Sequence, residues 1–319
     1  MRLCAVSVDL DEIPNYFAIH GLPEPGGPVR TLVYDLAVDR LASLARDAEI
    51  PLTLFAIGSD LVRPEAAAKL RVAREAGFEI SNHSLDHRYD LVRTGRAEIR
   101  RQIAEGASAI ERATGAAPVG FRAPGYTITD EVFDVLAELG VAYDSSVFPC
   151  PAYWAAKATA IALIGMRRRA SRSIIDTPAV LVAPTRPYRV GRPYWRRGRG
   201  NGLVELPVQV TRGLRLPFIG TAITNAFPGL PLLPMWGPRF ARRLARACVG
   251  EPLVNLELHG IDVLDTDDGL ADLRPHQKDV GVARERKVES ILAAVDELRM
   301  AGYTFVTLRD AASAVAASL

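Results

Sequence analysis

The chain has 319 residues, 49% of them hydrophobic and 24% charged, which allows one large core or two modest ones and excludes a disordered, collagen-like or coiled-coil protein. Its formal net charge is only +2, yet residues 151–250 hold 17 Lys and Arg against two acids, so that window carries +15 and the remainder −13. The cysteines, Cys4, Cys150 and Cys248, are too few and too far apart for a disulfide framework or a zinc ribbon, and we expect them to be buried in a protein of a reducing compartment.

Strand-like and helix-like segments alternate along the first half of the chain. The predicted strands are 3–8, 52–57, 78–81, 119–122, 141–144, 203–206, 253–258 and 303–307. The predicted helices are 31–47, 64–77, 98–112, 129–140 and 282–300. The first apolar run is too short for a signal peptide or a membrane span, which predicts a cytoplasmic protein. No regular strand–helix unit is evident between about 145 and 202.

This alternation predicts parallel strands covered by helices. We therefore expect an α/β fold, a distorted (β/α) barrel of about seven strands, formed by one domain over residues 1–319 with an irregular basic insertion at about 150–250. A doubly wound open sheet is the alternative. Its nucleotide-binding form is disfavoured because no Gly-x-Gly-x-x-Gly follows the first strand.

Chemically active side chains occur where five predicted strands end. They are Asp9, Asp11, His83, His87, Arg122, Asp144 and His259. The carboxyl ends of the strands of an α/β barrel share one face, where catalytic groups gather, so the sequence predicts one site. His83 and His87 are spaced i, i+4 and face the same way if their loop is helical. Two imidazoles and a carboxylate such as Asp11 form a recurring catalytic zinc set, which leaves Asp9 to handle a proton.

Five segments in this order resemble the motifs of the polysaccharide deacetylase family, also called the NodB homology domain. They are 7–11 (Ser-Val-Asp-Leu-Asp), 83–87 (His-Ser-Leu-Asp-His), 121–125 (Phe-Arg-Ala-Pro-Gly), 143–146 (Tyr-Asp-Ser-Ser) and 256–259 (Leu-Glu-Leu-His). The resemblance runs from residue 1 to about 310 and is weakest in the middle third. It implies a barrel that holds a divalent metal, usually Zn²⁺, with Co²⁺, Ni²⁺, Mn²⁺ or Fe²⁺ as alternatives.

The resemblance also implies a role for each motif residue. Asp11, His83 and His87 hold the metal, Asp9 is the general base and His259 the general acid. Arg122 orients Asp9, the backbone amide of Gly125 or Tyr126 stabilises the oxyanion, and Asp144 supplies a supporting charge. The sequence departs from the commonest pattern at two points: Leu10 separates the two aspartates of the first motif, and no tryptophan follows Asp144.

The predicted function is metal-dependent hydrolysis of an N-acyl group, acetyl or formyl, from an amino sugar of the cell envelope. The alternatives are an allantoinase-like or cyclic-imide C–N hydrolase and a non-catalytic carbohydrate- or lipid-binding relative. We expect His20 and His276 at the surface and the tryptophans in the core.

The basic insertion predicts an anionic partner. Apolar residues 153–166 precede Arg167, Arg168 and Arg169, and apolar residues 214–236 precede the arginines of 239–246. Apolar stretches beside arginines are typical of contact with anionic lipid, so we expect a lipid-linked sugar phosphate as substrate and peripheral attachment to the inner membrane face. Pairing of these arginines with acids elsewhere in the fold is the alternative. No nucleic-acid-binding motif accompanies the charge.

Overall fold

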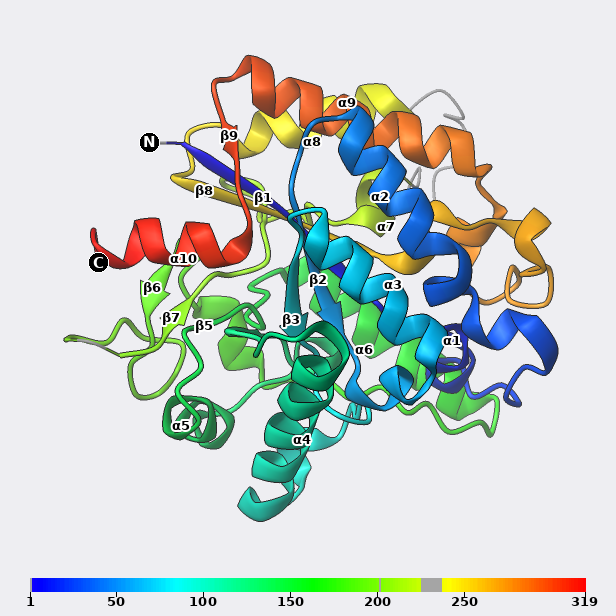
Figure 1. The fold of residues 1–319 in the computed structure, drawn as a ribbon, viewed down its shortest axis with the longest axis horizontal. Coiled ribbons are helices and arrows are strands. Elements are labelled where there is room, and N and C mark those ends of the chain that lie inside the picture. The colour runs from blue at the N-terminus through cyan, green and yellow to red at the C-terminus, as the bar shows by residue number, and fades with distance from the viewer. Residues whose placement is uncertain (1, 201, 225–236) are drawn as a thin grey trace.

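The computed structural model describes residues 2–200, 202–224 and 237–319, which form one curled sheet with helices packed around it (Figure 1). The strands are β1 (Leu3–Asp9), β2 (Leu52–Ala56), β3 (Glu79–Asn82), β4 (Gly120–Phe121), β5 (Tyr143–Asp144), β6 (Tyr188–Arg189), β7 (Val204–Glu205), β8 (Leu253–His259) and β9 (Thr304–Phe305). The α-helices are α1 (Ile13–Ile19), α2 (Val38–Asp47), α3 (Pro64–Glu75), α4 (Arg96–Thr114), α5 (Asp130–Glu138), α6 (Pro151–Met166), α7 (Gly220–Thr224), α8 (Gly237–Cys248), α9 (Arg284–Met300) and α10 (Leu308–Ala316).

The sheet is an incompletely closed barrel, as predicted. Its order is β6-β7-β5-β4-β3-β2-β1-β8, with β9 also paired to β1, and every pair is parallel except β6 with β7. Nine strands are described rather than about seven: each of the eight predicted segments contains a strand, including β9, and the short β6 is the additional one. An irregular segment completes the wall beside β8, where the Gln209 amide donates to the Asn255 carbonyl at 3.1 Å and Ile219 bridges Glu257.

The two faces of β1 and β8 are buried in different parts of the molecule. Val6 and Val8 pack outward into the large cluster beneath α2 and α9, whereas Leu3 and Ala5 pack inward beside Phe55. Side chains alternate between the faces of a strand, so Asp9 follows Leu3 and Ala5 into the barrel interior. The same alternation in β8 turns every second residue from Leu253 to His259 inward. The barrel fold thus decides which polar residues can meet.

Helix α6 lies in the part of the chain where the sequence indicated no regular unit. Its sequence, PAYWAAKATAIALIGM, has apolar residues on all sides and only one charge, so it lacks the polar face by which a surface helix is recognised. The helices α1, α7, α8 and α10 were also not predicted. The predicted helix at 31–47 is divided into a 3₁₀ turn (Gly27–Thr31), a π-helical turn (Val33–Ala37) and α2.

The remaining predictions about composition can be compared with the structure directly. All three cysteines are buried and free. Trp154 and Trp195 pack against the core cluster around α5, while Trp236 and most of the apolar stretch 214–236 lie outside the described residues. Within the described ranges, no helix is both long enough and apolar enough to cross a membrane.

Candidate active site

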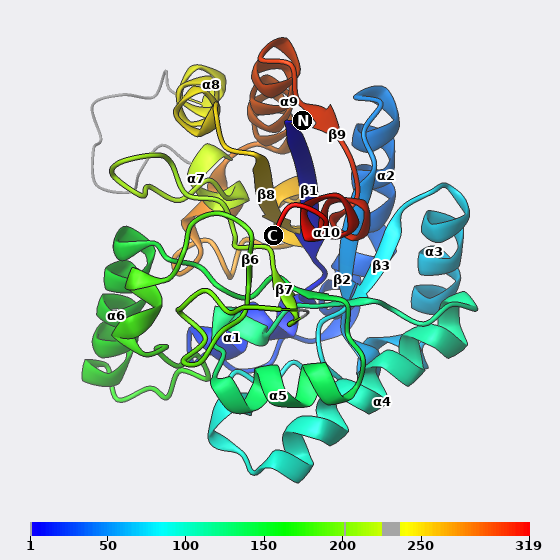
Figure 2. The same cartoon turned by 90° about the vertical axis from the view of Figure 1, so that its left-hand side faces the viewer.

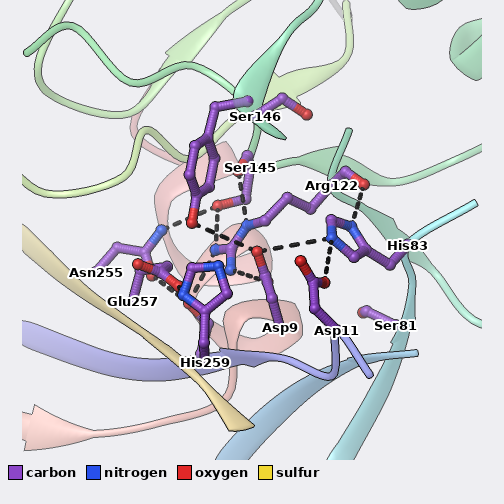
Figure 3. Close-up of polar contacts among 12 residues, drawn as sticks. Asp9, Asp11, Ser81, His83, Arg122, Ser145, Ser146, Asn255, Glu257 and His259 are labelled. Carbon is purple, nitrogen blue, oxygen red and sulfur yellow. Dashed lines mark hydrogen bonds and ion pairs between the residues drawn. The ribbon is translucent and has the colours of Figure 1, made fainter. Parts of the chain in front are cut away.

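The predicted metal ligands come together at the carboxyl ends of β1 and β3. Asp11 Oδ1 lies 3.3 Å from His83 Nε2 (Figure 3). It lies 3.2 Å from His87 Nε2, and all three side chains are buried. Burial by itself raises the pKa of Asp11, but the two imidazoles outweigh it and hold that pKa well below its usual range. Burial also lowers the pKa of His87, which favours the neutral imidazole that binds metal.

The other nitrogen of each ring is already engaged, which orients the rings toward Asp11. His83 Nδ1 lies 2.7 Å from the Arg122 carbonyl oxygen, and His87 Nδ1 lies 3.3 Å from Asn15 Oδ1. Each acceptor calls for a proton on Nδ1, leaving the Nε2 lone pair free toward Asp11. Asp11 Oδ1 and His87 Nε2 are buried without a hydrogen-bond partner among the described residues. Together with His83 Nε2, these two atoms could coordinate a divalent cation through two nitrogen ligands and one oxygen ligand.

The histidines converge for a different reason from the one the sequence suggested. Their loop is not helical, because Ser84 and His87 have positive φ values of 69° and 49°. Ser84 Oγ accepts a hydrogen bond from the His87 amide at 3.2 Å, and its own amide donates to Asn82 Oδ1 at 3.0 Å. A turn built by Asn82 and Ser84, rather than a helical face, therefore brings the two rings together.

Asp9 and Arg122 form a buried ion pair beside these ligands. Arg122 Nη1 donates to Asp9 Oδ1 at 2.6 Å, and the guanidinium is fully buried. Its remaining donors reach Ser7 Oγ at 2.8 Å, Ser145 Oγ at 3.0 Å and the Ser145 carbonyl at 2.9 Å. Arg122 is thus held on several sides, and it fixes one oxygen of Asp9. The other oxygen, Oδ2, lies 3.7 Å from His83 Nε2.

His259 is paired with a carboxylate that sequence reasoning missed. Its Nδ1 lies 2.8 Å from Oε1 of Glu257, which is fully buried two residues earlier on the same inward face of β8. Burial alone lowers the pKa of His259, but the charge of Glu257, with those of Asp9 and Asp11, raises it well above the usual range. The i, i+2 spacing on one strand was a usable signal, because such residues share a face.

Asp144 lies on the opposite side of its strand. Tyr143 packs in the barrel interior, so Asp144 points outward and the inward position falls to Ser145. Asp144 accepts hydrogen bonds from the amide and hydroxyl of Ser146, at 2.9 and 2.8 Å, and neighbours Glu205. Ser146 Oγ in turn accepts from the Ala123 amide at 2.8 Å. Through Ser146, Asp144 is thus linked to the Arg122–Gly125 loop, and it is not among the described residues that line the pocket.

That loop contributes Gly125 and Tyr126, whose φ values of 61° and 57° are in the left-handed region. The Tyr126 amide donates to the Ala123 carbonyl at 3.1 Å, while its hydroxyl lies 3.5 Å from Asp9 Oδ2. A Cβ on Gly125 would come within 2.8 Å of the Tyr89 ring, so both conformation and space require glycine here.

The site opens into a pocket of about 340 Å³. Helix α6 forms one wall with Ala156, Lys157, Ala160, Ile161 and Ile164. His20 is half-buried against the pocket rather than solvated, and it pairs with Gln277 at 3.0 Å; His276 is stacked beside it. A larger hollow of about 1040 Å³ between α2 and α3 contains none of the predicted site residues.

Comparison with known proteins finds a similarity to one family. The family model described as polysaccharide deacetylase matches residues 32–143. Over this stretch, about a third of its length, the chain is similar to the polysaccharide deacetylase family. Among curated proteins, the peptidoglycan deacetylase of Helicobacter pylori is 24% identical over 147 residues, which span 46% of this chain and about half, 49%, of that protein.

Solved structures share the fold of this chain. A Mycobacterium smegmatis protein assigned to the same group has a TM-score of 0.60 at 21% identity, covering 99% of this chain and 91% of its own. A CE4 family pseudoenzyme from Bacillus anthracis has a TM-score of 0.50 at 11% identity, covering 97% of this chain and 64% of its own. Because a pseudoenzyme has the same fold, activity must be argued from the site.

The residues matched by the family model include the histidine and arginine motifs but not the first motif (7–11) or the last (256–259). His83, His87 and Arg122 fall within residues 32–143, whereas Asp9 and His259 lie outside. The missing residues are supplied by β1 and β8, which pair with each other so that Asp9 is directly opposite His259.

Proposed function

We propose that this protein hydrolyses the N-acyl amide of an amino sugar, releasing acetate or formate and the free amine. One observation carries the proposal: three groups needed for amide hydrolysis line the same pocket. They are the candidate ligand set of Asp11, His83 and His87, of which Asp11 and His83 line the pocket, the Arg122-held carboxylate of Asp9, and the Glu257-paired imidazole of His259. The similarity to the polysaccharide deacetylase family supports the same reaction class and a divalent metal.

Asp11, His83 and His87 would hold the metal, for which Zn²⁺ is our first choice. When bound, such a cation polarises the scissile carbonyl and makes water more acidic. Asp9 then takes the proton of the attacking water, and Arg122 keeps its carboxylate aimed. His259 donates a proton to the departing nitrogen, as its raised pKa allows. Because the Tyr126 amide is used within its turn, the Gly125 amide is the better donor to the oxyanion.

The test is the release of acetate or formate from N-acetyl and N-formyl amino sugars by metal-free and zinc-reloaded protein. We expect activity only after reloading, and a loss of at least about 100-fold in Asp9→Asn, the lower range for removing a general base. Activity that survives both chelation and His83→Ala would contradict the proposal. An allantoinase-like or cyclic-imide hydrolase would instead act on ring amides in the same panel. An inactive binding relative would bind sugars equally well with Asp9→Asn.

The pocket further favours a single sugar attached to an apolar carrier over the interior of a polymer. Helix α6 closes one side of the cleft, and its pocket-facing side chains other than Tyr153 and Lys157 are aliphatic. The volume of the pocket is at the lower end of the range for small-molecule sites. We expect a higher kcat/KM on a lipid-linked N-acyl amino sugar than on a soluble N-acyl sugar polymer, and the reverse preference would overturn this part of the proposal.

The outer side of α6 suits the membrane surface where such a substrate resides. None of its residues is buried, Leu163 and Met166 are 47% and 72% exposed, and it ends directly at the exposed Arg167, Arg168 and Arg169. In Figure 2, α6 lies at the edge of the molecule, outside the sheet. Some arginines of the insertion instead pair with acids elsewhere: Arg186 and Arg212 with Glu251, Arg192 with Asp134, and Arg246 with Glu297. Arg167–Arg169 make no ion pair with any described residue.

Liposome co-sedimentation tests this attachment, with the cytoplasmic face as the proposed location. Each arginine near an anionic leaflet contributes about 1 kcal/mol, and this attraction weakens as the Debye length falls from about 10 Å at 0.1 M salt to about 3 Å at 1 M. We expect binding to phosphatidylglycerol vesicles but not phosphatidylcholine vesicles at low salt, and loss of binding when Arg167–Arg169 are changed to Ser. The variant Arg71→Ser/Arg74→Ser on α3 is the matched control. Equal binding to both vesicles would contradict the proposal.

A further inference from the structure

Lys157 is a cation inside the pocket that the proposed reaction does not use. It is the only Lys or Arg among the described residues that line the pocket, and it stands on the wall formed by α6, where its neighbours are uncharged. Its Nζ donates to the Gly125 carbonyl at 2.7 Å and lies 5.8 Å from the centre of the Tyr153 ring. The ammonium group therefore sits beside the loop that supplies the proposed oxyanion donor.

No carboxylate neutralises this ammonium group. Within the described part of the chain no acid lies within ion-pairing distance of Lys157, and only one of its three N–H donors has a partner. Asp176 acts on it from farther away, and burial lowers the pKa of Lys157 to about 8, so most molecules remain charged at neutral pH. A half-buried charge without a counter-ion is unfavourable unless a ligand supplies one.

The acids of the site do not require this positive charge. Asp9 already pairs with Arg122 at 2.6 Å, and Asp11 faces two imidazoles and the proposed metal site. A neutral donor would satisfy the Gly125 carbonyl equally well. The free donors of Lys157 thus remain directed to whatever occupies the pocket.

We infer that Lys157 binds an anionic substituent of the substrate, so that the protein acts on a negatively charged N-acyl amino sugar. A phosphoryl group and a carboxylate share the chemistry that an ammonium group recognises, since both offer several acceptor oxygens. This inference rests on the proposed function, and it narrows the substrate from any N-acyl amino sugar to one with an anion close to the amide.

The experiment compares three substrates: neutral methyl N-acetylglucosaminide, N-acetylglucosamine 1-phosphate and the carboxylate-bearing N-acetylmuramic acid. We expect wild-type kcat/KM to be highest for one of the two anionic sugars, and which one identifies the anion. In Lys157→Met the ratio of anionic to neutral kcat/KM should fall about 10- to 100-fold, the range for losing a charge-assisted hydrogen bond. Lys157→Arg should retain most of the ratio. Arg168→Met, which removes an exposed cation of the same insertion, is the matched control.

A binding measurement separates failure of this inference from failure of the proposed function. Metal-free protein is titrated with N-acetylglucosamine 1-phosphate and with the neutral glycoside, and its melting temperature is followed. Stabilisation by the anionic sugar that disappears in Lys157→Met supports the inference even if no substrate is hydrolysed. Hydrolysis of all three sugars with a ratio that Lys157→Met leaves unchanged would overturn it while leaving the proposed function intact. Unaltered melting of each variant without ligand confirms that it folds.

Discussion

Replacing Glu257 with Gln tests the unexpected partner of His259. Glu257 is fully buried, and among the described residues neither of its carboxylate oxygens has a hydrogen-bond partner other than the ion-paired His259 ring. Gln keeps the shape of the side chain but removes the charge that holds the imidazolium. The variant should therefore fold and bind metal, since Asp11, His83 and His87 are untouched, yet donate a proton to the leaving nitrogen less readily.

The size of the effect follows from the contact at 2.8 Å between His259 Nδ1 and Glu257 Oε1. A hydrogen bond to a charged group contributes about 1.5–3 kcal/mol, and each 1.36 kcal/mol changes a rate tenfold, so kcat/KM should fall about 10- to 150-fold. The pH profile should also change. The raised pKa of His259 keeps the proton donor intact to high pH; without Glu257 that pKa falls, and the alkaline limb of the profile moves to lower pH.

The assay is product release from the best N-acyl sugar between pH 5 and 10, with zinc content and melting temperature measured on each variant. Glu205→Gln is the matched control because Glu205 is also a buried glutamate, but it lies beside Asp144 on the outward face of the sheet. An unmoved alkaline limb in Glu257→Gln, or an equal movement in Glu205→Gln, would refute the reasoning.

Three further predictions concern the ion pair, the metal and a buried acid. Arg122→Met should lower the free energy of unfolding by about 3–5 kcal/mol in urea denaturation, because it leaves Asp9 buried without a partner; a loss below 1 kcal/mol would contradict this. Zinc added to metal-free protein should raise the melting temperature, and His83→Ala should remove the rise, since an ion that binds only the folded state stabilises it. Burial, with the charges of Glu12 and Asp11, raises the pKa of Asp60 to about 8, above its unfolded value, so stability should decline as pH rises from about 4 to 8. Asp60→Asn should flatten that decline in denaturation curves at several pH values, and an unchanged slope would count against the assignment.

The sequence by itself determined most of the barrel and the identity of its reactive residues. Short apolar strands that end in Asp, His or Arg locate the carboxyl edge of the sheet. The reason is that the carboxyl ends of parallel strands lie on one face of a barrel, and side chains alternate between the two sides of each strand. Asp9, Asp11, His83, His87, Arg122 and His259 were all predicted as one site, and the structure brings their side chains together at the carboxyl edge of the sheet. Helix α6 was not predicted, because a helix that is apolar on every side gives no periodic signal.

Tertiary structure alone decided how these residues are partnered. The inward or outward direction of a side chain depends on the register of the sheet, which placed Glu257 rather than Asp144 beside the reactive groups. The convergence of His83 and His87 depends on left-handed backbone at Ser84 and His87, which no spacing rule specifies. The closure of the pocket depends on where the insertion packs against the barrel. This packing lets Lys157 donate a hydrogen bond to the carbonyl of Gly125, 32 residues earlier in the chain. Contacts between segments so far apart in the chain are determined by tertiary packing, and local sequence preferences do not predict them.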